Sequence, residues 1–101
     1  MTHDWVSDVV RRRQYVVSHH ADQERMNDNL SIAEIETSII NGRLLESYPD
    51  TGRGESVLIV GFTDAGRPIH TVIGRRGSEG VIITVYIPGP PKFADPFHRS
   101  K

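Results

Sequence analysis

Residues 80–88 read Gly-Val-Ile-Ile-Thr-Val-Tyr-Ile-Pro, and this stretch decides the fold. All seven residues from 81 to 87 are β-branched or aromatic, so a pleated backbone gives their stiff side chains room on both faces. Gly80 and Pro88 bracket the run, and a proline ends a central strand because it has no N–H to donate to a neighbour. The stretch therefore predicts the central strand of a β-sheet.

Three more strands are predicted on the N-terminal side of this one. Residues 56–62 and 67–73 are strand-like runs joined by a short polar turn. Residues 43–48 precede them across a second polar turn at 49–54. Consecutive strands joined by short turns pair antiparallel, so the four should form a meander.

Helices are predicted before the strands. In residues 4–13 the apolar side chains recur at helical spacing, with acidic residues at the start and arginines at the end. Ser18 can cap a second helix over residues 19–28. Residues 14–18, which lead into this helix and hold Tyr15, Val16 and Val17, are interpreted as a short strand or an extended link.

The best-marked helix follows Ser31. Ser31 and Glu34 form a capping box, and Leu30 and Ile35 occupy the two positions of a hydrophobic staple. The helix is predicted to end at Asn41-Gly42, in the left-handed conformation that glycine tolerates.

The predicted fold class is α+β, with two or three N-terminal helices packed on one face of a four-stranded, mainly antiparallel sheet. A chain of 101 residues is too short to divide into two stable cores, so residues 1–87 are expected to form a single domain. Residues 88–101 hold four of the six prolines and are predicted to be an extended C-terminal tail, pinned to the body by Phe93 and Phe97.

Composition narrows the classes of function. The absence of cysteine excludes disulfides, thiolate metal sites and cysteine nucleophiles, and it fits a reducing compartment. A net charge of −1 argues against a basic nucleic-acid coat protein. The first apolar residues are followed by Arg11, Arg12 and Arg13, and no stretch is long enough to span a membrane. We expect a cytoplasmic protein without a signal peptide.

The expected strand register collects three polar side chains on one face of the sheet. A loop centred on Gly77 places His70 opposite Thr84 and close to Tyr86. The preceding turn places Ile59 opposite His70. The other face should be apolar and covered by the helices; it is expected to pack against Ile35 and Ile39 and to be led by Val60, Ile69, Ile83 and Val85.

His70, Thr84 and Tyr86 together have the parts of a general acid/base site. An imidazole titrates near neutral pH, and a phenol and a hydroxyl can orient it. The alternative is an ordinary polar contact between strands on a half-exposed face. In either case His70→Ala should cost only roughly 0.2–1 kcal/mol and leave the fold intact, and in the first case it should abolish growth arrest. His19 and His20 are neighbours about 100° apart on a helix and cannot share one metal ion, so no metal site and no cofactor are predicted.

The chain resembles a family of small bacterial domains of unknown function that are regarded as relatives of RelE-like and BrnT-like toxins. The resemblance covers residues 15–93 and rests on these motifs: Ser18-x-His20-Ala21, Arg25-Met26, Leu30-Ser31-Ile32-x-Glu34-Ile35, Glu46-Ser47-Tyr48-Pro49-Asp50, Gly66-Arg67-Pro68-Ile69-His70 and Ile83-Thr84-Val85-Tyr86-Ile87-Pro88. It implies helices on one side of an antiparallel sheet and an RNA site on the open side. The residues to which it points are the catalytic candidates His20, His70, Thr84 and Tyr86 and the substrate-binding candidates Arg25 and Arg67.

Two hypotheses follow from these observations. The first is the toxin of a toxin–antitoxin pair, acting as a metal-independent endoribonuclease that is either free or ribosome-dependent, with RNA or the ribosome and an antitoxin protein as partners. The second is a non-catalytic module that binds a protein through the same open face or through its proline-rich tail.

Overall fold

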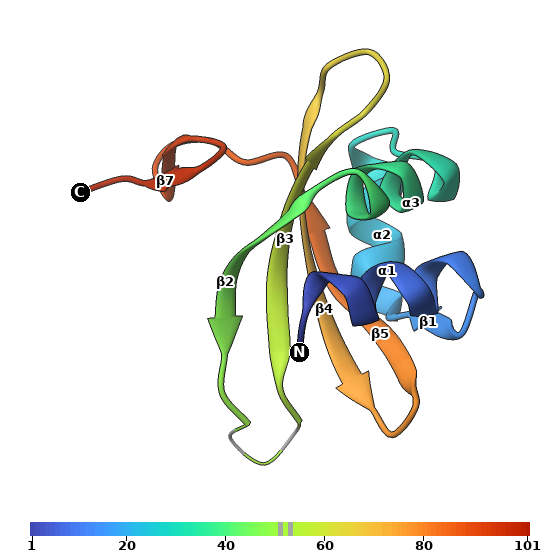
Figure 1. Cartoon of the computed structure of the whole chain (residues 1–101). Coiled ribbons are helices and arrows are strands. Elements are labelled where there is room, and N and C mark those ends of the chain that lie inside the picture. The colour runs from blue at the N-terminus through green and yellow to red at the C-terminus, as the bar shows by residue number, and fades with distance from the viewer. Residues whose placement is uncertain (51, 53) are drawn as a thin grey trace.

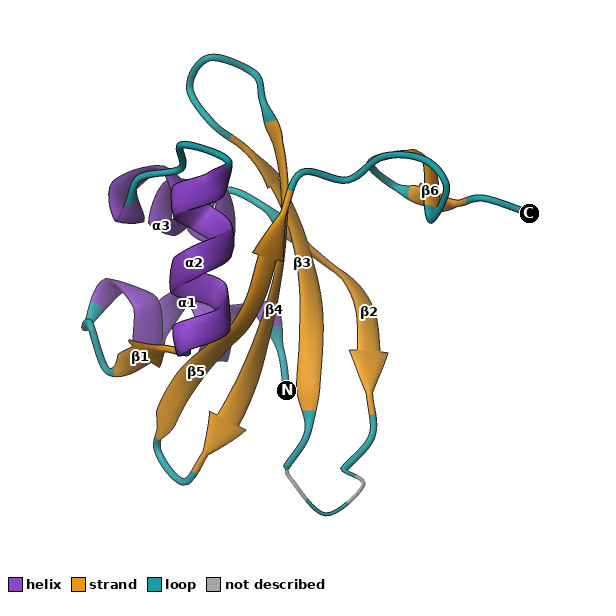
Figure 2. Ribbon diagram, turned by 180° about the vertical axis from the view of Figure 1, so that it is seen from behind, coloured by secondary structure: helices purple, strands orange, loops and turns teal. Residues whose placement is uncertain are grey.

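In a computed structural model that describes residues 1–50, 52 and 54–101, three helices pack on one face of a five-stranded sheet (Figures 1 and 2). The helices are α1 (His3–Arg11), α2 (His19–Asn27) and α3 (Ile32–Ile40). The strands of the sheet are β1 (Tyr15–Val17), β2 (Arg43–Tyr48), β3 (Ser56–Phe62), β4 (Pro68–Arg76) and β5 (Glu79–Tyr86). A small separate hairpin of β6 (Phe93–Asp95) and β7 (His98–Arg99) follows. The predicted α+β class is confirmed.

The sheet has one strand more than predicted. Its order is β1-β5-β4-β3-β2, in which β2 to β5 form the expected antiparallel meander. β1 is the fifth strand and pairs parallel to β5, so the predicted four-stranded sheet is corrected to five strands. Residues 15–17 lie opposite residues 80–82, and Gln14, just before them, accepts a hydrogen bond from the N–H of Gly80. No helix in the described ranges is long and apolar enough to cross a membrane.

Beyond the end of β1, helix α2 and its cap supply the hydrogen-bond partners for the edge of β5. The N–H of Ser18 donates to the carbonyl of Ile82, and its hydroxyl donates to the carbonyl of Ile83, both at 2.9 Å. Further along α2, the Glu24 carboxylate accepts the N–H of Val85 at 3.1 Å. These bonds satisfy an edge that would otherwise be free to pair with another chain.

The signals that predicted α3 are confirmed at its start and wrong at its end. Ser31 and Glu34 make both bonds of the capping box at 3.0 Å. The end is not left-handed, since Asn41 has a φ of −90° and Gly42 does not adopt a positive φ. Glycine is needed at position 42 for space instead, because a Cβ there would lie 2.3 Å from the carbonyl oxygen of Val60.

The predicted turn at 49–54 is described in part. Thr51 and Arg53 lie outside the described residues. Around them, one carboxylate oxygen of Asp50 accepts the N–H groups of Gly52 and Gly54 at 2.8 and 2.9 Å, as expected of an aspartate that closes a turn.

The strand register differs from the prediction by one residue between β3 and β4. His70 lies opposite Val60 instead of Ile59, which places Val60 on the helix-free face. Between β4 and β5, a turn at Gly77, with φ +62°, and a bulge after Val72 together shift the pairing by two residues. His70 therefore lies opposite Tyr86 instead of Thr84.

The two shifts have different consequences for the faces. A shift of two residues keeps a side chain on its face, whereas a shift of one moves it to the other. Ile69 and Val85 therefore pack under the helices as predicted, while Val60 does not. The bulge also turns Ile83 outward, where 42% of its surface is exposed.

Two hydrophobic groups hold the layers together. The main core joins the helices to the near face of the sheet and contains Ile35, Ile39, Val57, Ile59, Ile69, Ile73, Ile82 and Val85. Leu58, Val60 and Phe93 are also buried but lie outside that core. Leu58 and Val60 share the helix-free face with His70, and Phe93 packs against that histidine from the C-terminal tail. The prediction that Phe93 pins the tail is thus confirmed, although residues 93–99 form a hairpin instead of a purely extended segment.

Candidate functional site

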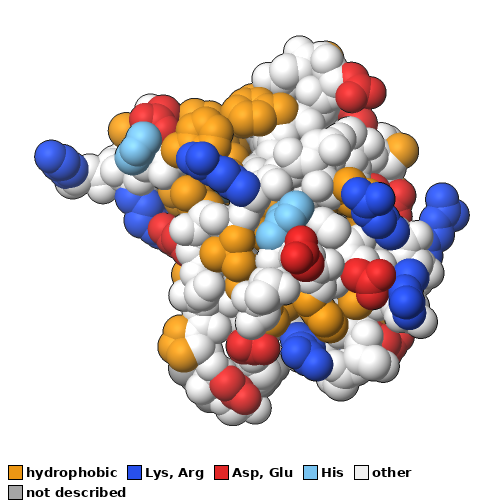
Figure 3. Space-filling view, viewed as in Figure 1, with side chains coloured by type: hydrophobic (Ala, Val, Ile, Leu, Met, Phe, Trp, Pro, Cys, Tyr) orange, Lys and Arg blue, Asp and Glu red, His pale blue; other side chains and the backbone are white. Residues whose placement is uncertain are grey.

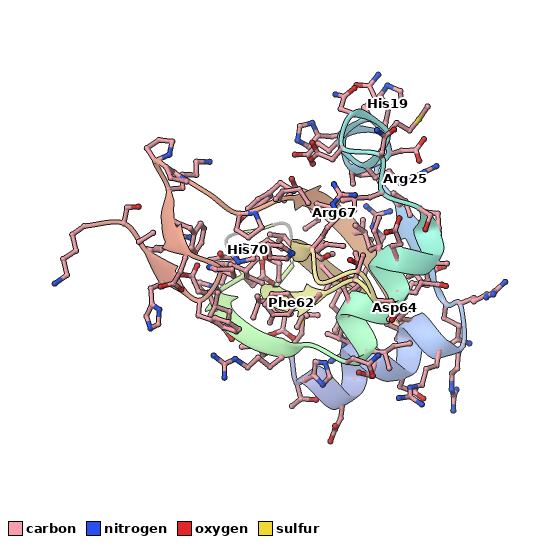
Figure 4. All side chains as sticks on the ribbon, turned by 90° about the horizontal axis from the view of Figure 1, so that it is seen from above. His19, Arg25, Phe62, Asp64, Arg67 and His70 are labelled. Carbon is pink, nitrogen blue, oxygen red and sulfur yellow. The ribbon has the colours of Figure 1, made fainter. Side chains whose placement is uncertain are left out.

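His70 lies at the centre of the helix-free face and is fully buried. Figure 4 shows it between the helices and the C-terminal segment. Its Nε2 lies 2.6 Å from the carbonyl oxygen of Pro96, and its Nδ1 lies 3.2 Å from the hydroxyl of Tyr86. A carbonyl can only accept, so Nε2 carries the proton and Nδ1 accepts from Tyr86. The contacts therefore select one tautomer of a neutral imidazole.

Two aromatic rings enclose this imidazole. The ring of Phe93 meets it edge to face with centroids 4.4 Å apart, and the ring of Tyr86 lies at 5.2 Å. Burial lowers the pKa of His70, while the bond to Pro96 and the charge of Glu46 act in the opposite direction. In this arrangement His70 is held neutral and away from solvent.

Glu46 and Arg99 form an ion pair beside His70. Arg99 donates from Nε and Nη2 to the two carboxylate oxygens of Glu46, both at 2.7 Å, and Tyr48 donates to the same carboxylate at 2.6 Å. Hydrogen bonding from Arg99 lowers the pKa of Glu46 to about 2. Burial, followed by the bond to Glu46, raises the pKa of Tyr48 to about 12. The carboxylate is thus ionised and fully engaged.

Sequence reasoning did not identify Glu46, Tyr48 or Arg99 as site residues. A signal existed for the first two, because they alternate along β2 and so share the face that carries His70. Arg99 had no such signal. It belongs to the segment 89–101, which we call the C-terminal cover, and its position depends on how that segment folds back onto the sheet.

Thr84 and His20 belong to a second group at the edge of β5. The Thr84 hydroxyl donates to the carboxylate of Glu24, which also lies 3.2 Å from Nε2 of His20. Thr84 lies opposite Val72, so its predicted pairing with His70 is wrong. The structure places His20 with Glu24 at the sheet edge and directs Thr84 toward α2.

Arg25 and Arg67 belong to a third group, at the turn between α2 and α3. Arg25 pairs with Asp22 at 2.7 Å and donates to the carbonyl of Leu30 at 3.3 Å. Arg67 donates to the carbonyl of Asp28 at 2.8 Å. The two guanidinium groups therefore converge on one turn of backbone, and Figure 4 shows Arg25 and Arg67 close to each other.

The predicted residues thus divide into three hydrogen-bonded groups. His70 and Tyr86 come together as expected. His20 approaches Thr84 through Glu24, and the arginines close a turn. Within residues 1–50, 52 and 54–101, no cluster of three His, Asp or Glu side chains is placed to hold a metal ion.

The buried histidine predicts a pH dependence of stability. In the folded protein the pKa of His70 lies below its ordinary value of 6.5, so between the two values the unfolded chain binds more protons. The stability associated with neutral His70 is complete above about pH 6.5 and is lost as the pH falls through the lowered pKa. We expect the free energy of unfolding in urea titrations to fall below pH 6.5, by at most about 1.4 kcal/mol per pH unit.

The variant His70→Gln should remove this slope. Glu46 acts in a separate window, because its pKa is lowered from 4.5 to about 2 and its contribution is lost only as the pH falls between those values. A slope between pH 6.5 and 4.5 that survives in His70→Gln would show that another group is responsible.

Comparison with known proteins identifies one relationship. A family model described as a domain of unknown function, DUF4258, matches residues 17–87. The match contains Glu46, His70 and Tyr86 and stops before the C-terminal cover. No curated protein and no solved structure matches the chain.

Proposed function

The chain belongs to the DUF4258 family of domains of unknown function, and we propose that it is a metal-independent endoribonuclease, the toxin of a toxin–antitoxin pair. The observation that carries the proposal is the bonded pair of His70 and Tyr86, with the Glu46 carboxylate close enough for its charge to affect the pKa of His70. An imidazole and a carboxylate on one face are the groups that acid/base cleavage of RNA requires. The helices lie on the other side of the sheet, which is the layout expected of RelE-like and BrnT-like toxins.

The reaction assigns one role to each group. Glu46 removes the proton from a ribose 2′-hydroxyl, and the resulting oxygen attacks the adjacent phosphorus. As the bond from phosphorus to the 5′-oxygen breaks, His70 gives its Nε2 proton to that oxygen; it acts as the imidazolium that forms once its face is open to solvent, since the closed structure holds it neutral. The products are a 2′,3′-cyclic phosphate and a 5′-hydroxyl. Tyr86 orients the imidazole through Nδ1.

The remaining predicted residues act outside this step. Thr84 positions the end of β5 through Glu24, which also contacts His20. Arg25 and Arg67 contact phosphates of a longer RNA at the turn between α2 and α3, in exchange for their present carbonyl partners.

A second candidate function is a non-catalytic module that binds a protein segment. The observation in its favour is that His70 is fully buried with both ring nitrogens bonded, as expected of a structural histidine. In that case the face under the C-terminal cover is a surface for peptides, and the cover is its occupant.

Expression of the full chain in a bacterial host, together with incubation of the purified protein with RNA, tests the proposal. His70→Gln keeps an amide donor for Pro96 and an acceptor for Tyr86 but cannot deliver a proton, so cleavage should slow by about a hundredfold to ten-thousandfold. His19→Gln is the matched control, since His19 is exposed on α2, and it should cleave like the wild type.

Two outcomes would decide against this function. If the wild-type chain neither arrests growth nor cuts RNA, with or without ribosomes, the binding-module function replaces the enzyme. If it cuts RNA and His70→Gln cuts equally fast, catalysis resides elsewhere on the chain.

A further inference from the structure

We infer that the face beneath the C-terminal cover is a binding site for single-stranded RNA, in which the rings of Phe93 and Phe97 occupy the positions of two unpaired bases. The cover and RNA then compete for one surface. The inference rests on the proposed ribonuclease function and adds how that site holds and excludes its substrate.

The first base position is the one filled by Phe97. Its ring lies 6.0 Å from the ring of Phe62, and the guanidinium of Arg43 lies 4.4 Å from its centre. A hollow of about 200 Å³ opens here, lined by residues 41–43, residues 60–62 and Phe97. Figure 3 shows hydrophobic side chains gathered beside the C-terminal segment, with a basic side chain crossing them.

This position suits a nucleobase. Phe62 is a large hydrophobic side chain with 41% of its surface exposed, although it belongs to a strand of the main sheet. Aromatic rings and arginine planes are the two surfaces on which unpaired RNA bases stack. A base in place of the Phe97 ring would contact both Phe62 and Arg43.

The second base position is the one filled by Phe93. Its ring meets the imidazole of His70 edge to face, with ring centroids 4.4 Å apart, while the carbonyl oxygen of Pro96 accepts the Nε2 proton of the same imidazole. A phosphate oxygen between two bases would accept that proton in the same way. The cover thus presents a ring, an oxygen and a second ring along the face, which is the order found in a dinucleotide.

The closed cover also disables the groups that cleave. Arg99 occupies both oxygens of Glu46, and Pro96 occupies the proton of His70. When the cover leaves, Arg99 goes with it, whereas Glu46, Phe62 and Arg43 remain on the sheet. The residues that remain lie inside the segment matched by the family model, and the whole cover lies outside it. Binding of RNA and release of the acid/base pair are therefore one event.

The experiment loosens the cover in the full chain and measures binding and opening separately. Arg99→Ala removes the pair with Glu46 and the contact of Arg99 with the ring of Phe93. The binding probe is a short, fluorescein-labelled 2′-O-methyl RNA, which cannot be cleaved, followed by anisotropy. Opening is followed by the rate at which diethyl pyrocarbonate modifies His70.

Arg99→Ala should raise both the affinity for the probe and the modification rate by about threefold to tenfold, because apparent affinity follows the open fraction. Adding Phe62→Ala to Arg99→Ala should remove the gain in affinity for the probe, while the raised modification rate of His70 remains. Adding Met26→Ala, a substitution of a 61% exposed side chain on α2, is the matched control and should change neither quantity.

Each result decides the inference. It is overturned if the modification rate of His70 rises while the affinity for the RNA probe is unchanged or does not depend on Phe62. It is also overturned if neither Arg99→Ala nor Phe97→Ala raises that modification rate. It is also overturned if a peptide of residues 89–101 protects the opened His70 and RNA does not, since the face is then a peptide site.

Failure of the ribonuclease function looks different: the probe binds through Phe62, but unmodified RNA of the same sequence stays intact. If the chain cleaves RNA and Phe62→Ala does not change the rate, the ribonuclease function stands and the base site at Phe62 is excluded.

Discussion

Gly61→Ala should destabilise the fold by about 3 kcal/mol or more, because among the glycines a Cβ at position 61 would come nearest to another backbone atom. Gly61 lies in β3, and a Cβ built on it would be 1.8 Å from the carbonyl oxygen of Ser38 and 2.6 Å from the carbonyl carbon. Both atoms belong to the backbone of α3, so no side-chain rotation can relieve the overlap. The helix would have to move away from the sheet.

Urea denaturation of the purified variant measures this loss. The matched control is Gly89→Ala, because no described atom lies within 4 Å of a Cβ at Gly89 and its φ is not positive. We expect that control to stay within about 0.5 kcal/mol of the wild type. A similar small change in Gly61→Ala would mean that α3 can shift without cost and that the close contact at Ser38 does not position it.

The elements of this fold could be predicted from the sequence because their signals are local. The capping box needs only Ser31 and Glu34, and the β5 strand needs only its run of β-branched residues. The register could not be predicted in the same way. It depends on a turn at Gly77 and a bulge after Val72, and both are settled by packing across the sheet.

The site could be predicted in part for the same reason. Tyr86 shares a face with His70 under both the expected and the observed register, because the two differ by two residues. Thr84 lies in the strand predicted for it, but its hydroxyl donates to Glu24, which is 60 positions away in the sequence. The pairing of Glu46 with Arg99 joins residues 53 positions apart and depends on the cover packing over the sheet. Neither partner carries a local signal for the other.

The burial of His70 changes what its removal should do. The sequence interpretation places this histidine on a half-exposed face, where losing a cross-strand pair costs roughly 0.2–1 kcal/mol. In the structure the imidazole is sealed beneath Phe93, and its removal leaves the hydroxyl of Tyr86 and the carbonyl of Pro96 without their partner. His70→Ala should therefore cost about 3–5 kcal/mol, from the cavity and the unpaired groups together.

This loss can be separated from catalysis by urea denaturation of three variants. His70→Ala should lose about 3–5 kcal/mol, His70→Gln distinctly less because its amide can reach the same partners, and His19→Ala almost nothing because His19 is exposed. A domain with a total stability of about 5–15 kcal/mol can be partly unfolded by the first change, so inactivity of His70→Ala alone does not identify a catalytic group. Inactivity of a folded His70→Gln does. If His70→Ala costs under about 1 kcal/mol, the C-terminal cover does not seal the histidine in solution, and the open face is then available to RNA without any displacement of the cover.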